Sequence, residues 1–218
     1  MAGDRRYTDG TIYLMRIPEQ LGFADVEGRM SVLSEERQRK IKRYLGEDSK
    51  VLSFCCAFLV RRILERDFHM AQEQICVSWL KGGKPVLVDG NGSICQPQIS
   101  WSHSRRAVAV AVSREPVGVD LEWIGRYRES IVRKNFSAAE RERLEHSDSP
   151  EQEFYRLWTR KEAFVKRSGE GMTRYLGDIP TQGDCFESRV WEQYMVSVCG
   201  VAGPAGWTYR VEELTGLL

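Results

Sequence analysis

Three charged residues fall within or beside the apolar side of a predicted helix, where charges are unusual. Lys161 lies in the middle of the apolar side, and Glu162 and Lys166, one turn apart, lie along its edge. An unpaired buried charge is costly, so the pattern predicts that these charges meet polar partners inside a cleft. The apolar residues recur at helical spacing and are Phe154, Leu157, Trp158, Phe164 and Val165.

A second charged pattern lies upstream, in a segment that alternates like a strand. Residues 117–122 place apolar side chains on one face and Gly118, Asp120 and Glu122 on the other. Two neighbouring carboxylates repel each other unless a cation lies between them, and such oxygen ligands suit Mg²⁺, with Mn²⁺ as an alternative. Taken alone, the pattern also fits an acidic strand that faces solvent. The charged helix downstream favours the metal site.

These two segments resemble the two signature motifs of the 4′-phosphopantetheinyl transferases, specifically the larger type that activates peptide synthetases. Residues 118–122 are similar to the G-[VI]-D-x-E strand, and residues 158–166 to the W-[ST]-x-K-E-[AS]-x-x-K helix. Other segments match in the same order, so the resemblance covers roughly residues 34–176. They are 83–85 (G-K-P), 99–104 (F-N-[IL]-S-H-S), 136–140 (F-[SA]-x-x-E) and 169–172 (G-x-G-[LM]).

The resemblance implies a metal-dependent transfer reaction. The 4′-phosphopantetheine group of coenzyme A would pass to a serine of an apo acyl or peptidyl carrier protein, with release of 3′,5′-ADP. Asp120, Glu122 and Glu162 are the implied metal ligands, with Mg²⁺ or Mn²⁺ as cofactor. The implied catalytic residues are Glu162, as candidate general base, together with Lys166 and His103. Which carrier protein is served cannot be inferred from these motifs.

The same resemblance implies where coenzyme A, the co-substrate, binds. Arg37 and Lys40 match the positions that hold its 3′-phosphate, although a basic helix of this type is also a common solvent-exposed feature. The loop Gly83, Lys84 and Pro85 would line the adenine pocket through its backbone.

At the pyrophosphate, His103 is the expected contact and Ser102 would orient it, whereas a lone histidine is more often structural. Lys166 would lie beside the same oxygens, and Lys161 would bind there and pair with Glu162 or Asp120. The chain departs from the family pattern at Ser100, where asparagine is common, and at Leu52, where arginine is frequent.

Glu140 has a structural explanation of its own. Ser137 and Glu140 form a capping box, with the serine at the helix N-cap and the glutamate three residues later. We therefore leave Glu140 out of the catalytic set, although it could pair with Lys161. The surface 131–136 is a weaker candidate for docking an acidic carrier helix.

Composition limits the other classes of function. The 218 residues contain 32 Lys and Arg against 31 Asp and Glu, for a net charge of +1, which argues against a general nucleic-acid or membrane binder. The first residues lack the apolar core of a signal peptide. Six cysteines without metal-binding spacing indicate reduced thiols, so we expect a cytoplasmic protein.

The predicted elements give an α+β fold with two similar halves. Expected strands are 11–17, 75–79, 85–88, 99–102, 107–113, 117–122, 190–199 and 207–211. Expected helices are 35–45 after Ser34, one capped by Asp48, one opened by Ser137, and 150–167. The resemblance implies two pseudo-symmetric lobes, 1–114 and 115–218, with the active site between them in a monomer. Residues 178–194 leave the far strands of the second lobe unassigned.

Two other functions remain open at this point. A non-catalytic protein that binds coenzyme A or a carrier domain could keep the same fold, but it would not need the carboxylate set. A nucleic-acid-binding module built on the helix 35–45 is a second alternative, disfavoured by the balanced charge.

Overall fold

Helices and strands are mixed irregularly along the chain, which confirms the predicted α+β class. The computed structural model describes residues 10–171, 175–203 and 206–214. The N-terminal residues used to judge a signal peptide, and residue 172 of the fourth family motif, lie outside these ranges. The helices (α), short 3₁₀ helices (η) and strands (β) are, in chain order, β1 (Thr11–Arg16), α1 (Phe23–Glu27), η2 (Met30–Val32), α2 (Glu35–Lys42), α3 (Glu47–Phe68), η3 (Gln72–Gln74), β2 (Cys76–Trp79), β3 (Pro85–Val88), β4 (Ile94–Cys95), β5 (Gln98–Ser104), β6 (Ala107–Ser113), β7 (Gly118–Trp123), α4 (Glu129–Asn135), α5 (Ala138–Glu145), α6 (Pro150–Ser168), η4 (Leu176–Asp178), β8 (Phe186–Trp191), β9 (Tyr194–Cys199) and β10 (Thr208–Glu212).

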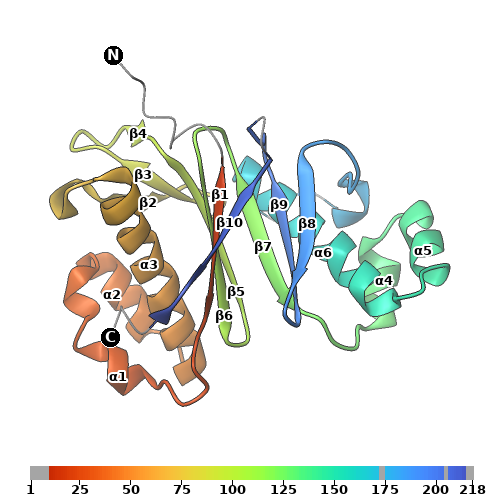
Figure 1. Cartoon of the computed structure of the whole chain (residues 1–218), viewed down its shortest axis with the longest axis horizontal. Coiled ribbons are helices and arrows are strands. Elements are labelled where there is room, and N and C mark those ends of the chain that lie inside the picture. Colours follow the sequence, from red (N-terminus) through yellow and green to blue (C-terminus); the bar gives the residue numbers. More distant parts are fainter. Residues whose placement is uncertain (1–9, 172–174, 204–205, 215–218) are drawn as a thin grey trace.

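Two sheets form the middle of the molecule, between helices on either side (Figure 1). One sheet has the strand order β10-β1-β6-β5, with β10 parallel to β1 and its other pairs antiparallel. The second sheet, β7-β9-β8, is antiparallel throughout. Helix α3 packs on the first sheet and α6 on the second, while α4 and α5 lie beyond α6 (Figure 1). A small third sheet, β2-β3-β4, contacts β5 through β3.

Strand β6 shows how side-chain alternation builds the two main cores. Its valines, Val108, Val110 and Val112, belong to the core under α3. Its alanines face the other way, into the core between the two sheets, where small side chains permit close approach. Strand β7 follows the same rule. Its apolar residues enter the core between the sheets, as predicted, and its acidic residues lie on the opposite face.

Helix α6 lies directly on β7, and Gly118 makes this contact possible. A Cβ atom at Gly118 would lie 1.9 Å from the carbonyl oxygen of Ala163 and 2.5 Å from the backbone nitrogen of Arg167. Any side chain would therefore push the helix away from the strand. This close approach brings the carboxylates of β7 next to the charged residues of α6.

Two local predictions need correction. Asp48 does not cap α3: the N-cap is Gly46, and Asp48 lies in the first helical turn, where it accepts a 3.0 Å hydrogen bond from Nη1 of Arg106. The single strand expected over 190–199 is a hairpin of β8 and β9, because Glu192 adopts a positive φ of 53° between them. Most of β8 comes from the segment that the sequence left unassigned.

The C-terminal strand β10 belongs to the sheet of β1, and not to the sheet of β8 and β9, which precede it in the chain. Strand β10 forms, as expected, but it pairs with β1 from Thr11↔Thr208 to Met15↔Glu212 and so completes the first sheet. The end of the chain thus returns to the sheet built by its beginning. The division into lobes at residues 114 and 115 stays a prediction.

Candidate active site

A cleft of about 400 Å³ lies where β5, β7 and α6 meet. It contains the two carboxylates of the predicted strand, the histidine His103, and Glu162 and Lys166 of the predicted helix, which come from three separate elements. The residues that line it are Trp101, Ser102, His103, Asp120, Glu122, Trp158, Glu162 and Lys166. The structure therefore brings together the three expected metal ligands and three of the expected substrate contacts.

Asp120 lies at the centre of the cleft and is only 3% exposed. Its Oδ1 accepts hydrogen bonds of 2.7 Å from Oγ of Ser102 and from Nζ of Lys166. Nζ of Lys166 also donates to Oγ of Ser102 at 2.8 Å, which closes a triangle of polar atoms. The other carboxylate oxygen, Oδ2, is buried and has no hydrogen-bond partner among the residues that the structure describes. A buried carboxylate oxygen without a partner is costly, and a bound cation would satisfy it.

The other two carboxyl groups of the cleft are difficult to ionise. Burial, and then the negative charge of Asp120, raises the pKa of Glu122 to about 7, although a 2.7 Å hydrogen bond from Oγ of Ser104 opposes the shift. Burial and Asp120 also raise the pKa of Glu162, and Lys166 opposes this. Three carboxyl groups thus share a site that holds one lysine.

The three carboxyl groups of the cleft are the kind of ligand that a hard divalent cation prefers. Only oxygen ligands are offered, as Mg²⁺ and Mn²⁺ prefer, and one of them is the unpartnered Oδ2 of Asp120. Across the described ranges, no three His, Cys, Asp or Glu side chains are grouped closely enough to hold a metal as they stand. The metal set Asp120, Glu122 and Glu162 therefore remains a prediction.

His103 lies at the open side of the cleft, at the end of β5. Protein atoms packed around its ring, and then the positive charges of Lys166 and Arg37, lower the pKa of His103, while Asp120 acts in the opposite sense. The neutral imidazole is therefore favoured and can both donate and accept a hydrogen bond.

The two residues expected to bind the 3′-phosphate, Arg37 and Lys40, both lie close to the ring of Trp79. The Arg37 guanidinium lies 5.2 Å from the ring centroid of Trp79 and 5.6 Å from that of Trp101, which also lines the cleft. Nη2 of Arg37 already donates to the hydroxyl of Ser53 at 2.8 Å, and its buried Nε has no partner within the described ranges. Nζ of Lys40 lies 4.1 Å from the Trp79 ring centroid, on an exposed residue. The phosphate role of both residues stays a prediction.

The loop expected at the adenine packs instead on the end of α6. Lys84 is buried, and its Nζ donates a 2.7 Å hydrogen bond to the carbonyl oxygen of Arg167. A Cβ at Gly82 would lie 2.0 Å from the carbonyl oxygen of Gly169, so the two loops touch through their backbones. The Lys84 ammonium thus stabilises the negative end of α6, and the role assigned to the backbone of Gly83, Lys84 and Pro85 stays a prediction.

Lys161, which was expected to contact the ligand, is not part of the lining of the cleft. Its side chain is fully buried, and Nζ lies 2.9 Å from Oε2 of Glu140. Nζ also donates to the carbonyl oxygens of Leu176 at 2.7 Å and Ile179 at 3.3 Å. The expected pairing of Lys161 with Glu162 or Asp120 is therefore wrong. Neighbouring helix residues point about 100° apart, so Lys161 faces α5 while the next side chain faces the cleft.

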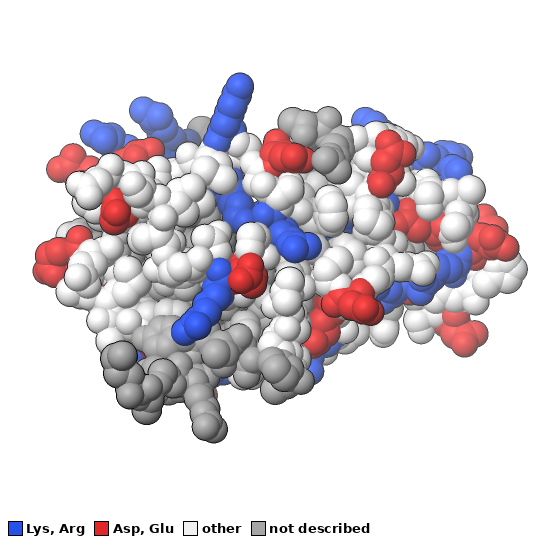
Figure 2. Space-filling model, turned by 90° about the horizontal axis from the view of Figure 1, so that it is seen from above, with Lys and Arg blue, Asp and Glu red and all other residues white. Residues whose placement is uncertain are grey.

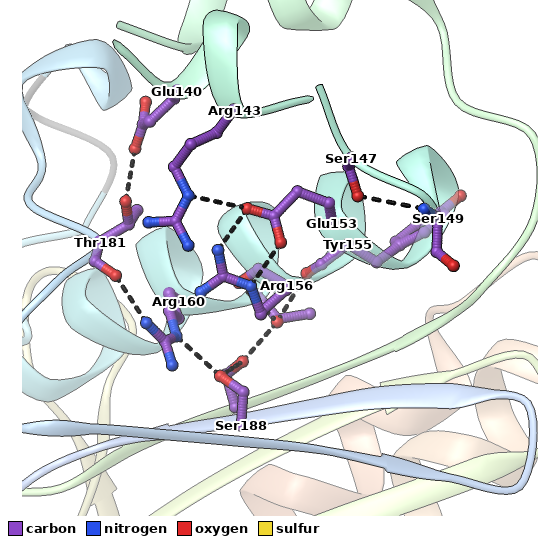
Figure 3. A network of polar contacts seen from close by, with 12 residues as sticks. Glu140, Arg143, Ser147, Ser149, Glu153, Tyr155, Arg156, Arg160, Thr181 and Ser188 are labelled. Carbon is purple, nitrogen blue, oxygen red and sulfur yellow. Dashed lines mark hydrogen bonds and ion pairs between the residues drawn. The ribbon is translucent and has the colours of Figure 1, made fainter. Parts of the chain in front are cut away.

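Glu140 has the structural role predicted for it and a further one. The capping box is present, with Glu140 N donating to Oγ of Ser137 at 3.3 Å and Ser137 N donating to Oε2 of Glu140 at 2.8 Å. Thr181 donates to Oε1 at 2.7 Å (Figure 3). The carboxylate thus joins α5, α6 and the segment after η4, and no oxygen of it is left without a partner.

The far face of α6 carries a second polar network (Figure 3). Arg160 donates to Oγ of Ser188 and to the carbonyl oxygen of Thr181, each at 2.8 Å. Glu153 pairs with Arg156 and, at 3.2 Å, with Arg143 of α5. These contacts hold α6 against its neighbours, so that its cleft-facing residues keep a fixed orientation.

Three residues of the cleft region were not predicted from the sequence. Trp101 and Trp158 line the cleft, although the sequence had used Trp158 only as part of an apolar stripe. Ser104 donates to Glu122. The signal for Ser104 was present, because Ser100, Ser102 and Ser104 alternate along one strand face.

The outer surface carries charges of both signs. On the face seen from above, Lys and Arg lie among Asp and Glu, and neither kind forms a continuous cover (Figure 2). Among the described residues, no helix is both long and apolar enough to cross a lipid bilayer. All six cysteines are free thiols, as predicted.

Comparison with known proteins agrees with the geometry of the cleft. Residues 116–212 match the model of the "4'-phosphopantetheinyl transferase superfamily". The 4′-phosphopantetheinyl transferase Sfp of Bacillus subtilis (strain 168) is 29% identical over 189 residues, which is 86% of this chain and 80% of that protein. The 4′-phosphopantetheinyl transferase psf-1 of Bacillus pumilus is 35% identical over 123 residues, 56% of this chain and 51% of that protein. The 4′-phosphopantetheinyl transferase gsp of Aneurinibacillus migulanus is 28% identical over 160 residues, covering 72% and 65%.

Proposed function

We propose that this chain is a 4′-phosphopantetheinyl transferase, which transfers 4′-phosphopantetheine from coenzyme A to a serine hydroxyl of an apo carrier protein. The other product is 3′,5′-ADP. The observation that carries this proposal is the buried Oδ2 of Asp120, unpartnered among three carboxyl groups. A site that only held the fold together would not leave its central carboxylate incompletely satisfied.

Asp120, Glu122 and Glu162 would hold the metal ion, Mg²⁺ or Mn²⁺. When bound, the ion would neutralise negative charge on the pyrophosphate of coenzyme A.

The remaining roles belong to side chains of the cleft. Lys166, which lies 2.7 Å from Asp120, would place a positive charge beside the phosphate that leaves with 3′,5′-ADP. His103 would donate a hydrogen bond to the pyrophosphate from the open side of the cleft. Glu162 would accept the proton of the carrier serine as that hydroxyl attacks phosphorus. Ser102 would keep Lys166 and Asp120 in place through its two hydrogen bonds.

Coenzyme A would extend from the cleft toward the basic residues of α2. Trp101 belongs to the lining of the cleft and also lies beside Arg37, so it connects the two regions. Lys40 is the better candidate for the 3′-phosphate, because it is exposed, whereas Arg37 already has Ser53 as a partner. A monomeric state and a cytoplasmic location, expected from the sequence, stay predictions.

A protein that binds coenzyme A or a carrier without catalysis is the second candidate function. Such a protein would need the basic residues but not three crowded carboxyl groups. Burial, and then the negative charge of Asp120, raises the pKa of Glu122 to about 7 and so disfavours its ionised form. A cation bound between the carboxyl groups would reverse this penalty.

The test is the intact mass of apo carrier proteins after incubation with this protein, coenzyme A and Mg²⁺. We expect a mass gain of one phosphopantetheinyl group on at least one carrier, and its loss when EDTA replaces Mg²⁺. Unchanged carriers, together with coenzyme A binding in a separate titration, would instead support the binding protein.

A further inference from the structure

Strands β5 and β7 lie side by side, yet they belong to different sheets and are not paired in the described part of the chain. Three serines at alternate positions of β5 bridge this gap. Oγ of Ser100 accepts a 3.1 Å hydrogen bond from the backbone nitrogen of Val119. Oγ of Ser104 accepts one of 3.2 Å from the backbone nitrogen of Trp123. Hydroxyl groups thus replace the backbone ladder that would join two neighbouring strands.

Ser102 and Ser104 also donate hydrogen bonds to the acidic side chains of β7. Ser102 donates its hydroxyl proton to Asp120 at 2.7 Å, and Ser104 donates to Oε2 of Glu122 at 2.7 Å. Ser104 therefore accepts from the backbone of residue 123 and donates to the side chain of residue 122. These two bonds hold the Glu122 carboxylate at a fixed place relative to its own strand.

We infer that Ser104 is a positioning residue, which holds Glu122 where it can share a divalent cation with Asp120. This inference rests on the proposed function. In the described part of the chain, Glu122 forms no ion pair with a lysine, whereas Asp120 is held by both Ser102 and Lys166. Among the described residues, Ser104 is thus the one hydrogen-bond partner of the Glu122 side chain. A hydroxyl that orients a metal ligand in this way commonly changes metal affinity by about 10-fold to 100-fold.

Ser100 supplies a matched control within the same strand. Its hydroxyl makes the same type of bond to the β7 backbone as that of Ser104, 3.1 Å against 3.2 Å, but it bonds to no carboxylate of the described residues. Ser100→Ala and Ser104→Ala therefore both remove one link between the strands. Only Ser104→Ala also releases a metal ligand.

The test is direct titration of Mn²⁺ into the full-length protein in the presence of coenzyme A, followed by electron paramagnetic resonance of the free ion. We expect Ser104→Ala to weaken Mn²⁺ binding by about tenfold or more, and Ser100→Ala to change it by less than about threefold. Ser104→Thr, which keeps the hydroxyl, should restore binding. Should Ser104→Ala fail to fold, Ser104→Cys gives the same comparison, because a thiol is a much weaker donor.

Two results would overturn the inference, and they are distinguishable. Wild-type binding of Mn²⁺ with equal effects of Ser100→Ala and Ser104→Ala would reduce Ser104 to a structural link and leave the proposed function intact. Absence of Mn²⁺ binding in the wild-type protein would remove the metal premise of the proposed function, and the role of Ser104 with it.

Discussion

Helix α6 carries two charged clusters on consecutive residues, and the clusters differ in how fully their charges are satisfied. Lys161 faces the interior, where Glu140 and the carbonyl oxygens of Leu176 and Ile179 take up its ammonium group. Glu162, the next residue, faces the cleft. There, Asp120 keeps a buried oxygen without a partner.

The difference separates structure from function within one helix. The Lys161 cluster is closed, since the three hydrogens of the ammonium group meet three acceptors, and it joins α5, α6 and η4. The cleft cluster is open, because its three carboxyl groups exceed the positive charge provided by Lys166. Buried charges without partners lower the stability of the fold unless a ligand pairs with them. We therefore expect the cleft cluster, and not the Lys161 cluster, to bind a ligand.

The largest effect is expected in the open cluster. Asp120→Asn keeps the size of the side chain but replaces the unpartnered Oδ2 or its companion oxygen with an amide nitrogen, which cannot bind a cation. We expect the rate of phosphopantetheine transfer to fall by about a thousandfold, with little change in the midpoint of urea unfolding. Near-native transfer at saturating Mg²⁺ would show that Asp120 is not a metal ligand.

The closed cluster should respond in the opposite way. Lys161→Met keeps the apolar stem but leaves the Glu140 carboxylate buried without its cation. We expect the free energy of unfolding to fall by about 3 kcal/mol in urea titrations. The transfer rate per folded molecule should stay within about threefold, since Lys161 does not reach the cleft. A selective loss of rate without loss of stability would mean that the two clusters are not separate.

A smaller effect distinguishes the ion pair from the helix cap. Glu140→Gln removes the charge that Lys161 needs, and we expect a loss of about 2 kcal/mol of stability. Ser137→Ala removes the hydroxyl of the same capping box and should cost only about 1 kcal/mol. Equal losses in thermal or urea unfolding would mean that capping alone accounts for Glu140.

The smallest expected effect extends the comparison to the basic residues of α2. Lys40→Ala should raise the apparent Michaelis constant for coenzyme A by about tenfold, because an exposed ammonium group would lose the 3′-phosphate. The constant for 3′-dephospho-coenzyme A should hardly change. Arg39→Ala is the control, because Arg39 pairs with Glu35, 4.0 Å away on the same helix. Equal effects of Lys40→Ala on both substrates would contradict the phosphate role.

Local patterns predicted the cleft well because they act within single elements. The alternation of β7 placed Asp120 and Glu122 on one face, and the helical spacing placed Glu162 and Lys166 one turn apart. The contact between these two elements requires Gly118, whose missing side chain lets α6 approach β7. The family resemblance supplied the pairing of these elements, which periodicity alone does not determine.

Contacts between distant segments escaped the sequence. The lysine at position 161 meets two carbonyl oxygens, one in η4 and one at its C-cap, and no pattern of residue types marks a backbone oxygen as a partner. Strand β10 pairs with β1 although almost the whole chain lies between them in the sequence, and the alternation of residues within a strand does not reveal which strand it pairs with. Asp48 looked like a helix cap, but Gly46 is the N-cap of α3, and Asp48 in the first turn pairs with Arg106 instead.

The most direct test of the open cluster is the position of a bound ion. A crystal of this protein grown with coenzyme A and Mn²⁺ would reveal manganese by its anomalous scattering. The account predicts one strong peak in the cleft, about 2.1 Å from an oxygen of Asp120 and bounded by Glu122, Glu162 and coenzyme A oxygens. A cleft without manganese, with coenzyme A bound and Oδ2 of Asp120 still unpartnered, would contradict it.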